Sequence, residues 1–271
     1  MIAIRNGWER IMKSFCLTID DNIRFLKELT EGELPSLFDH PYPAMLRRLH
    51  ERFALKVQLN LFYRTDGFDL SGMSERYRGE WADNADWLKL SFHSRLENVC
   101  PYAASGYGEV YEDCHAVHSQ ILRFASAASL AETTTVHCCE TTKEGLRALA
   151  DNGVRGLLGL FGDHGHPRTS YGLDGEAAEL LRGGRILYRD GMAYAPIDMV
   201  INCFSMSQIL PTLSSRLSQD TVRVMIHEQY FYEDYFAYQP DFEDKLTAVC
   251  GLLTSHGYES CFFEEWLGKQ D

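Results

Sequence analysis

The chain has 271 residues and a formal net charge of −13, from 39 acidic and 26 basic residues. Hydrophobic residues make up 45% and charged residues 24%, which are proportions of a folded protein and not of a disordered one. The acidic balance argues against nucleic acid or an anionic membrane as a partner, and the sequence has no apolar run of about 18 residues that could cross a membrane.

The first residues do not resemble a secretion signal. Arg5, Glu9, Arg10 and Lys13 interrupt the segment where a signal peptide would carry its apolar region. The eight cysteines form no CxxC pair and no dense framework, so we interpret them as buried thiols in preference to disulfides or a zinc-thiolate site. Both features predict a cytoplasmic protein.

Strand-like and helix-like segments alternate along nearly the whole chain. The predicted strands are, in order, residues 15–19, 56–62, 87–92, 133–138, 154–161, 199–204 and 222–226. A helical pattern begins near Ile23, and further helices are predicted at 42–52, 112–125, 142–152, 208–217 and 241–256. This alternation is typical of βα units on a mostly parallel sheet. About seven units without a dividing linker predict one α/β domain over residues 1–271, either a barrel or an open doubly wound sheet.

Two segments, 64–86 and 162–185, are predicted to be irregular. Loops of this length often bind ligands or cover an active site.

Histidine and carboxylate side chains follow four of the predicted strands. They are Asp20 and Asp21 after the first strand, His93 and Glu97 after the third, His137 at the end of the fourth, and His227 and Glu228 after the last. Active sites of βα barrels are built at the carboxyl ends of the strands, so these side chains are expected on one face. Imidazole and carboxylate ligands suit zinc, iron, cobalt or manganese. One such histidine alone would more often be structural, but the coincidence across four strands favours a metal site.

Short motifs resemble those of the polysaccharide deacetylase family, also called the NodB-homology or carbohydrate esterase 4 family. Leu17-Thr18-Ile19-Asp20-Asp21 looks like the family's opening Thr-Phe-Asp-Asp motif, and Phe92-His93-Ser94-Arg95-Leu96-Glu97 is similar to its His-Ser/Thr-x-x-His motif. Val224-Met225-Ile226-His227 resembles its late apolar strand, which ends in Leu-x-His, and segment 142–153 resembles the helix after its third motif. The likeness spans roughly residues 14–265 and implies a distorted (β/α)7 barrel.

The resemblance also implies a chemistry, the metal-dependent removal of an N- or O-acyl group from a sugar. It implies that Asp20 is the general base, that Asp21 and His93 are metal ligands, and that His227 is the general acid. Glu97 stands where the family has a third ligand histidine, and a carboxylate can still bind a divalent ion. Zinc is the preferred ion, with cobalt, manganese and iron as alternatives.

Three further residues are predicted to contact substrate: His137, Glu228 and Tyr230. Tyr230 belongs to an aromatic and acidic segment, 227–238, whose rings suit a sugar, although they would equally suit the barrel mouth or a subunit contact. The expected substrate is a small or nucleotide-linked acylated sugar.

The sequence departs from the family at its later motifs. His137-Cys138-Cys139 stands where the family has an arginine and prolines, and segment 162–171 has no clear counterpart of its Asp and Trp. Two alternatives therefore stay open: a non-catalytic barrel that binds carbohydrate, and a metal-dependent hydrolase of another bond.

Overall fold

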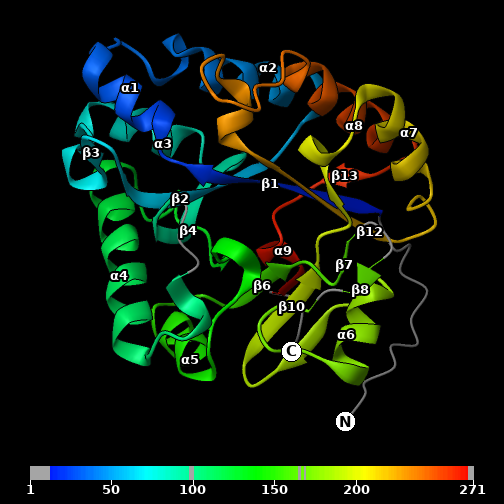
Figure 1. Ribbon diagram of the computed structural model, residues 1–271. Coiled ribbons are helices and arrows are strands. Elements are labelled where there is room, and N and C mark those ends of the chain that lie inside the picture. The colour runs from blue at the N-terminus through cyan, green and yellow to red at the C-terminus, as the bar shows by residue number, and fades with distance from the viewer. Residues whose placement is uncertain (1–12, 98–100, 164–165, 168, 268–271) are drawn as a thin grey trace.

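The computed structural model describes residues 13–97, 101–163, 166–167 and 169–267, with strands in the middle and helices around them (Figure 1). The strands are β1 (Ser14–Asn22), β2 (Val57–Thr65), β3 (Phe68–Asp69), β4 (Leu88–Leu96), β5 (Thr133–Thr134), β6 (Gly156–Gly159), β7 (Gly162–Asp163), β8 (His166–Pro167), β9 (Leu187–Arg189), β10 (Met192–Pro196), β11 (Met199–Val200), β12 (Thr221–His227) and β13 (Glu259–Ser260). The helices are α1 (Arg24–Gly32), α2 (Pro41–Phe53), α3 (Arg78–Asp83), α4 (Tyr107–Phe124), α5 (Lys143–Asp151), α6 (Gly175–Arg182), α7 (Met206–Ser214), α8 (Phe242–Ser255) and α9 (Glu264–Leu267).

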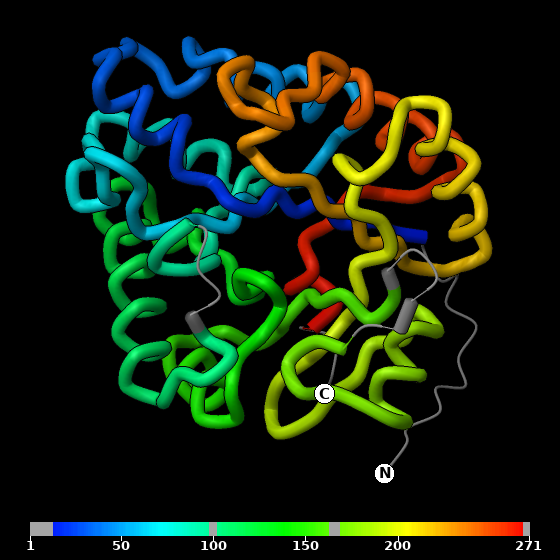
Figure 2. The backbone as a smooth tube through the Cα atoms, in the orientation of Figure 1, coloured from blue at the N-terminus to red at the C-terminus, as the bar shows by residue number. Residues whose placement is uncertain are grey.

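Seven strand positions form a distorted barrel, in which the consecutive strands β10 and β11 together make one position. The strands β11, β12, β1, β2 and β4 pair in parallel in that order, and β5, β6 and β10 form a second parallel group. Figure 2 shows how strand β12, late in the chain, returns to lie beside the N-terminal strand β1.

Two junctions join these groups into one ring. At the first, Leu90 of β4 forms a parallel bridge with Leu130, just before β5. At the second, the link from β10 to β11 bonds to both groups: the Ile197 N–H donates to the Gly159 carbonyl after β6, and the Asp198 N–H donates to the Arg223 carbonyl of β12. Before that link, the edge of β10 that faces away from β6 pairs with the antiparallel strand β9. The barrel therefore closes only near its carboxyl end.

All seven predicted strands and all six predicted helices are confirmed in position. Three strands are shorter than predicted. The predicted strand 154–161 covers only Gly156–Gly159, and the other two end early because His137–Cys139 and Ile201–Cys203 turn into 3-10 helices. The β9–β10 hairpin was not predicted, although its turn residues Asp190 and Gly191 both have positive φ, as an Asp-Gly hairpin turn requires. The segments predicted to be irregular contain the short helices α3 and α6.

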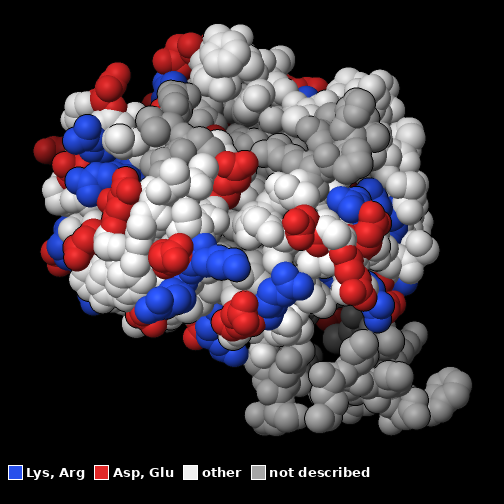
Figure 3. Space-filling view, turned by 60° about the horizontal axis from the view of Figure 1, so that its bottom comes forward, with Lys and Arg blue, Asp and Glu red and all other residues white. Residues whose placement is uncertain are grey.

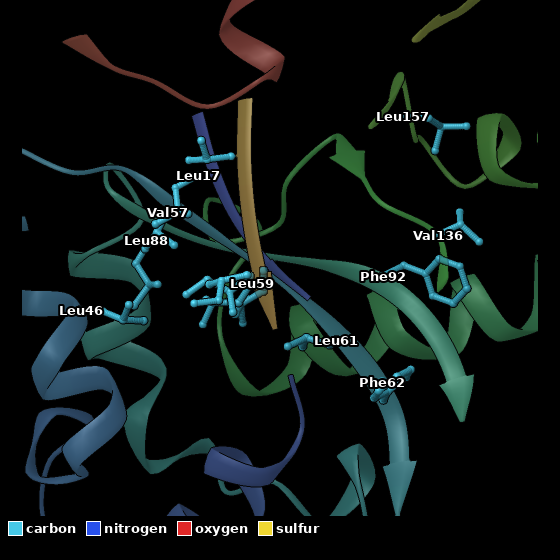
Figure 4. Close-up of a cluster of buried hydrophobic side chains, with 14 of the residues drawn as sticks. Leu17, Leu46, Val57, Leu59, Leu61, Phe62, Leu88, Phe92, Val136 and Leu157 are labelled. Carbon is cyan, nitrogen blue, oxygen red and sulfur yellow. The ribbon is translucent and has the colours of Figure 1, made fainter. Parts of the chain in front are cut away.

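Side chains alternate between the barrel interior and the outer core. Phe15, Leu17 and Ile19 of β1 join the large cluster beneath the helices, whereas Cys16 joins a smaller one with Leu158, Ala193, Ala195, Ile197, Met225, Phe263 and Leu267. Figure 4 shows part of the outer cluster, with Leu46 of α2 near Leu88 of β4. Because period-two alternation puts Thr18 and Asp20 on the same side of β1 as Cys16, these polar residues face the interior.

The C-terminal segment closes the amino end of the barrel. A Cβ atom at Gly156 would lie 2.8 Å from Phe263 Cε1 and 3.0 Å from Leu267 Cδ1, so these two side chains fill the interior at the start of β6. The opposite end stays available for a site. No helix in the described part of the chain is long and apolar enough to span a membrane.

Candidate metal centre

Asp21, His93 and His137 converge at the carboxyl end of the barrel. His93 Nε2 lies 3.0 Å from Asp21 Oδ1 and 3.1 Å from His137 Nδ1, and His137 Nδ1 lies 3.4 Å from the same Oδ1. Asp21 and His93 are buried, and the His137 side chain is 17% exposed. These atoms form the one group of three or more potential metal ligands found among the described residues.

Irregular backbone aims two of these side chains. The register between β1 and β2 shifts between Ile19 and Asn22, and Asp21 has a φ of 64°. The register between β2 and β4 shifts at the point where His93 is the extra residue. Such bulges redirect a side chain from its regular alternation and are frequent next to active sites. Cys138 and Cys139, directly after His137, also have positive φ.

Neighbouring groups fix the orientation of the candidate ligands. The Thr135 carbonyl bonds His93 Nδ1, which leaves the Nε2 lone pair facing Asp21. Gln229 Nε2 donates to Asp21 Oδ2 at 2.9 Å. Asp21 Oδ1 is buried and accepts no hydrogen bond of good geometry from the described residues. Asp21 Oδ1, His93 Nε2 and His137 Nδ1 thus face one another, with fewer protons among them than hydrogen bonds between all three would need.

This donor set fits a divalent cation. Ligand bonds of 2.0–2.2 Å put neighbouring ligand atoms about 3.0 Å apart in octahedral and about 3.4 Å apart in tetrahedral coordination. The three observed separations, 3.0, 3.1 and 3.4 Å, fall in this range. Burial alone would raise the pKa of Asp21, but the adjacent His137 and His93 side chains outweigh it and hold that pKa well below its usual range. The carboxylate therefore stays ionised, as a metal ligand must.

Asp20 lies beside this cluster and is held by an amide. It is 1% exposed, and Asn60 Nδ2 donates to its Oδ1 at 2.6 Å. Asn60 is itself fixed by Gln58 Nε2, which donates to both Asn60 Oδ1 and the Thr133 carbonyl. Burial raises the pKa of Asp20, and the nearby His93 and His227 offset part of that rise. A carboxylate with a raised pKa is a better proton acceptor than a free one.

His227 lies opposite Asp20 on the neighbouring strand. Its Nδ1 bonds Asn202 Oδ1 at 2.9 Å, and Gln239 Nε2 in turn donates to the Asn202 carbonyl at 2.8 Å. Because Asn202 Oδ1 can only accept, Nδ1 carries the proton in the neutral ring. Nε2 is then the nitrogen available to the cavity that His227 lines.

The structure places Glu97 outside the ligand cluster. It follows the end of β4, and its Oε1 lies 3.3 Å from Gln229 Nε2, so it reaches Asp21 only through that amide. β4 continues to Leu96, so the backbone at residue 97 has moved away from His93 along the strand. His137, on the neighbouring β5 segment, occupies the third position instead.

Glu228 is buried and its hydrogen-bond partners are structural. It is fully buried, and its carboxylate accepts hydrogen bonds from the backbone N–H groups of Ile23, Arg24 and Phe25 and from the Tyr232 hydroxyl. Adjacent residues on a strand point to opposite sides, so when His227 faces the cavity Glu228 faces the start of α1. These hydrogen bonds occupy both oxygens of the Glu228 carboxylate, which leaves neither for a substrate.

Tyr230 lies next to the site and is half-buried. Its ring centroid lies 6.1 Å from that of His227 and 5.3 Å from that of Tyr235. It is not among the described residues that line the cavity. Three positioning residues, Asn60, Asn202 and Gln229, were not predicted, because an amide carries no recognisable motif. Their places after or within predicted strands are the one signal that could have identified them.

A cavity of about 750 Å³ opens at this end of the barrel. Asp20, His93, His137 and His227 line one part of it, and apolar residues such as Phe161, Ile197 and Met199 line much of the rest. Its volume is within the range of small-molecule sites. The cavity thus places two of the candidate ligands, His93 and His137, in contact with a space large enough for a sugar-sized molecule.

Comparison with known proteins supports the fold. No protein-family profile and no curated protein sequence matches the chain. Among solved structures it is similar to a 4-α-glucanotransferase from Thermococcus litoralis, with 14% identity and a TM-score of 0.63 over 95% of this chain and 40% of that one. It is also similar to a peptidoglycan N-acetylglucosamine deacetylase, with 10% identity and a TM-score of 0.53 over 93% of this chain and 86% of that one.

A third likeness is to the carbohydrate esterase 4 domain of a multidomain xylanase from the hindgut metagenome of Trinervitermes trinervoides, with 10% identity and a TM-score of 0.50 over 95% of this chain and 90% of that one. At such identities these likenesses show the fold alone. The chain is a distorted (β/α)7 barrel of the NodB type, as the motif resemblance implied. A glucanotransferase has a similar barrel, so any activity must be argued from the site.

Proposed function

We propose that this chain is a divalent-metal-dependent hydrolase that removes an N- or O-acyl group from a carbohydrate. The observation that carries the proposal is the convergence of Asp21, His93 and His137 beside Asp20 and His227 in one cavity. The similar structures include a peptidoglycan N-acetylglucosamine deacetylase, which supports the same chemistry.

In this proposal each residue has a distinct role. Asp21, His93 and His137 hold the metal, with His137 in the position that the motif resemblance gave to Glu97. A bound divalent cation would polarise the acyl carbonyl and acidify a water molecule. Zinc remains the preferred ion, because two imidazoles and one carboxylate are a common zinc ligand set.

Asp20 and His227 would move the protons. Asp20 accepts a proton from the attacking water, and the Asn60 amide keeps its carboxylate oriented during that transfer. His227, oriented by Asn202 through Nδ1, would act as the imidazolium and donate its Nε2 proton to the departing amine or alcohol. Because the two residues are partners across β1 and β12, one proton acceptor and one proton donor flank the same scissile bond.

Glycosyl transfer is less well supported by the cavity. That reaction generally uses two carboxyl groups about 5–9.5 Å apart, one on each side of the glycosidic bond. The described carboxylates that line the cavity are Asp20 and Asp198. Asp198 is held by Arg223, whose Nη2 lies 2.7 Å from Asp198 Oδ2, with both side chains at most 3% exposed. A carboxylate held in this way is not free to act on a sugar.

The proposed substrate is a small or nucleotide-linked acylated sugar, and the proposed location is the cytoplasm, on the basis of the sequence features given above. The two alternatives are a non-catalytic carbohydrate-binding barrel and a hydrolase of another bond. Acetate release from a panel of N- and O-acetylated sugars by zinc- or cobalt-loaded protein separates them, with Asp20→Asn as the matched inactive control.

Release of acetate by the parent and not by Asp20→Asn is the expected result. Sugar binding without release by either protein would favour the non-catalytic barrel. Hydrolysis of other ester or amide substrates, with none of the acetylated sugars, would favour the other bond.

A further inference from the structure

Two arginines form a basic wall of the cavity. Arg182, the last residue of α6, and Arg216, in the turn after α7, both line it. On the face shown in Figure 3, Lys and Arg side chains lie among Asp and Glu side chains, and the chain as a whole has a net charge of −13. Among the described residues, the carboxylates that share the cavity with these arginines are Asp20, at the candidate site, and Asp198.

Asp198, a carboxylate that lines the same cavity, is paired with Arg223 and interacts with Arg216 only at a longer distance. Asp198 Oδ2 accepts hydrogen bonds from the Arg223 backbone N–H and Nε, both at 2.9 Å, and Arg223 Nη2 lies 2.7 Å away. The Arg223 side chain is 1% exposed, so this pair is a closed unit within the wall. In the described part of the chain, Asp198 makes no ion pair with Arg182 or Arg216.

Arg216 and Arg182 keep donors for a ligand. The Arg216 guanidinium has no ion-pair or hydrogen-bond partner among the residues that the structure describes. Arg182 donates from Nη1 to the Phe161 carbonyl at 3.2 Å and from Nη2 to Glu179 at 2.6 Å. A guanidinium has five N–H donors, and the Glu179 side chain is 72% exposed, so this pair is weak and a ligand could replace it.

The surroundings strengthen the attraction for an anion. Phe161, Ile197 and Met199 line the same cavity, and apolar walls lower the local dielectric constant and lengthen the reach of a charge. Arginine is well suited to phosphate and carboxylate groups, because its planar guanidinium can donate two parallel hydrogen bonds to them.

We infer that Arg182 and Arg216 bind an anionic group, a phosphate or a carboxylate, on the acylated carbohydrate whose acyl group lies near Asp20 and His227. The position of the acyl group rests on the proposed function, whereas the anion site rests on the arginines alone. A neutral acetylated sugar would fill the cavity but leave the basic wall without a partner.

Calorimetric titration of metal-loaded protein with three ligands tests the inference. The ligands are N-acetylglucosamine 1-phosphate, N-acetylmuramic acid and neutral N-acetylglucosamine, and an Asp20→Asn background prevents turnover. We expect one of the two anionic sugars to bind at least about tenfold more tightly than the neutral one, as charge-assisted hydrogen bonds predict. The preferred anion tells whether phosphate or carboxylate is recognised.

Two variants and one control locate the effect. Arg216→Gln and Arg182→Gln should remove most of the anion preference, whereas Arg189→Gln, at an exposed arginine of β9 away from the cavity, should keep it. Equal binding of the three sugars by the parent would overturn the inference, and so would an anion preference that survives in Arg216→Gln, since the anion would then be bound by the metal or elsewhere.

Acetate release, measured separately with Asp20 intact, distinguishes this inference from the proposed function. Anion binding through Arg216 without acetate release from any sugar would leave the anion site standing and reject the hydrolase. Acetate release that is equally fast in the parent and in Arg216→Gln, for neutral and anionic sugars alike, would leave the hydrolase standing and reject the anion site.

Discussion

Asp20 on β1 and His227 on β12 are direct partners in the parallel register of the two strands. Asp20 is held by Asn60 and His227 by Asn202, so each is oriented by its own amide. This pairing puts the proposed proton acceptor and the proposed proton donor on adjacent strands that are distant in sequence. It also explains why the site needs a closed barrel, because the β1–β12 pair forms only when the last strand returns to the first.

Replacing Asp20 by asparagine should stop turnover without releasing the metal. The amide has nearly the same shape but cannot accept the proton of water, so acyl release should fall about 10²- to 10⁴-fold. Acetate release and bound metal, both measured on the purified variant, check this. Turnover within a factor of two of the parent would remove Asp20 from the proposed role.

Replacing His227 by glutamine should affect poor leaving groups most. An amine needs a proton to depart, whereas a nitrophenolate does not, so the loss should be large for an N-acetylated sugar and small for p-nitrophenyl acetate. Comparing the two rates in the variant and the parent measures the difference. An equal loss on both substrates would indicate that His227 does not protonate the leaving group.

Glu228 should make the stability of the protein depend on pH. Burial raises the pKa of Glu228 to about 7, against an ordinary value of 4.5. Between these values the folded protein holds a proton that the unfolded chain has released, so its free energy of unfolding falls as the pH rises. Glutamine does not titrate. The stability advantage of the parent over Glu228→Gln should therefore shrink between pH 5 and pH 8, by on the order of 3 kcal/mol.

Urea unfolding of both proteins at several pH values measures that difference. Other titrating groups act on both proteins alike and cancel in the comparison. A difference that is constant or that grows with pH would show that the Glu228 carboxyl titrates at or below its ordinary pKa in the folded protein.

The buried pair of Asp198 and Arg223 should be important for stability. Asp198→Asn leaves the Arg223 charge without its counter-ion in an interior where both side chains are at most 3% exposed, which should cost about 3–5 kcal/mol of unfolding free energy. The matched control is Glu132→Gln in the exposed pair with Arg155, where both side chains are 51% exposed and the expected cost is below about 1 kcal/mol. Urea unfolding would contradict this if the two substitutions cost the same.

The strand pattern of the sequence was sufficient to predict the barrel and the positions of most candidate site residues. Asp20, Asp21, His93 and His227 follow apolar runs, and such runs reliably become buried strands whose carboxyl ends meet. The third member of the candidate ligand cluster could not be predicted in this way. A motif gave Glu97, but β4 continues to Leu96 and moves residue 97 along the strand, whereas His137 reaches the site because β5 stops after Thr134.

Glu228 and the amides show the other limit of the sequence. A carboxylate next to His227 suggests a site, yet which face of the strand it takes depends on the position of α1, which packs there only in the folded chain. Likewise, the roles of Asn60 and Asn202 depend on hydrogen-bond partners that are 40 and 25 residues away in the sequence. Contacts of this kind are set by the closure of the barrel and not by local pattern.

The most direct test of the central claim is the amount of metal bound per chain, measured by elemental analysis after zinc loading and removal of excess ion. We predict about one equivalent in the parent, a loss of most of it in His137→Ala and His93→Ala, and full retention in Glu97→Gln, because the three ligand atoms belong to Asp21, His93 and His137. Metal retained in His137→Ala and lost in Glu97→Gln would contradict the proposed centre, and no metal in the parent after loading would contradict a metal-dependent site altogether.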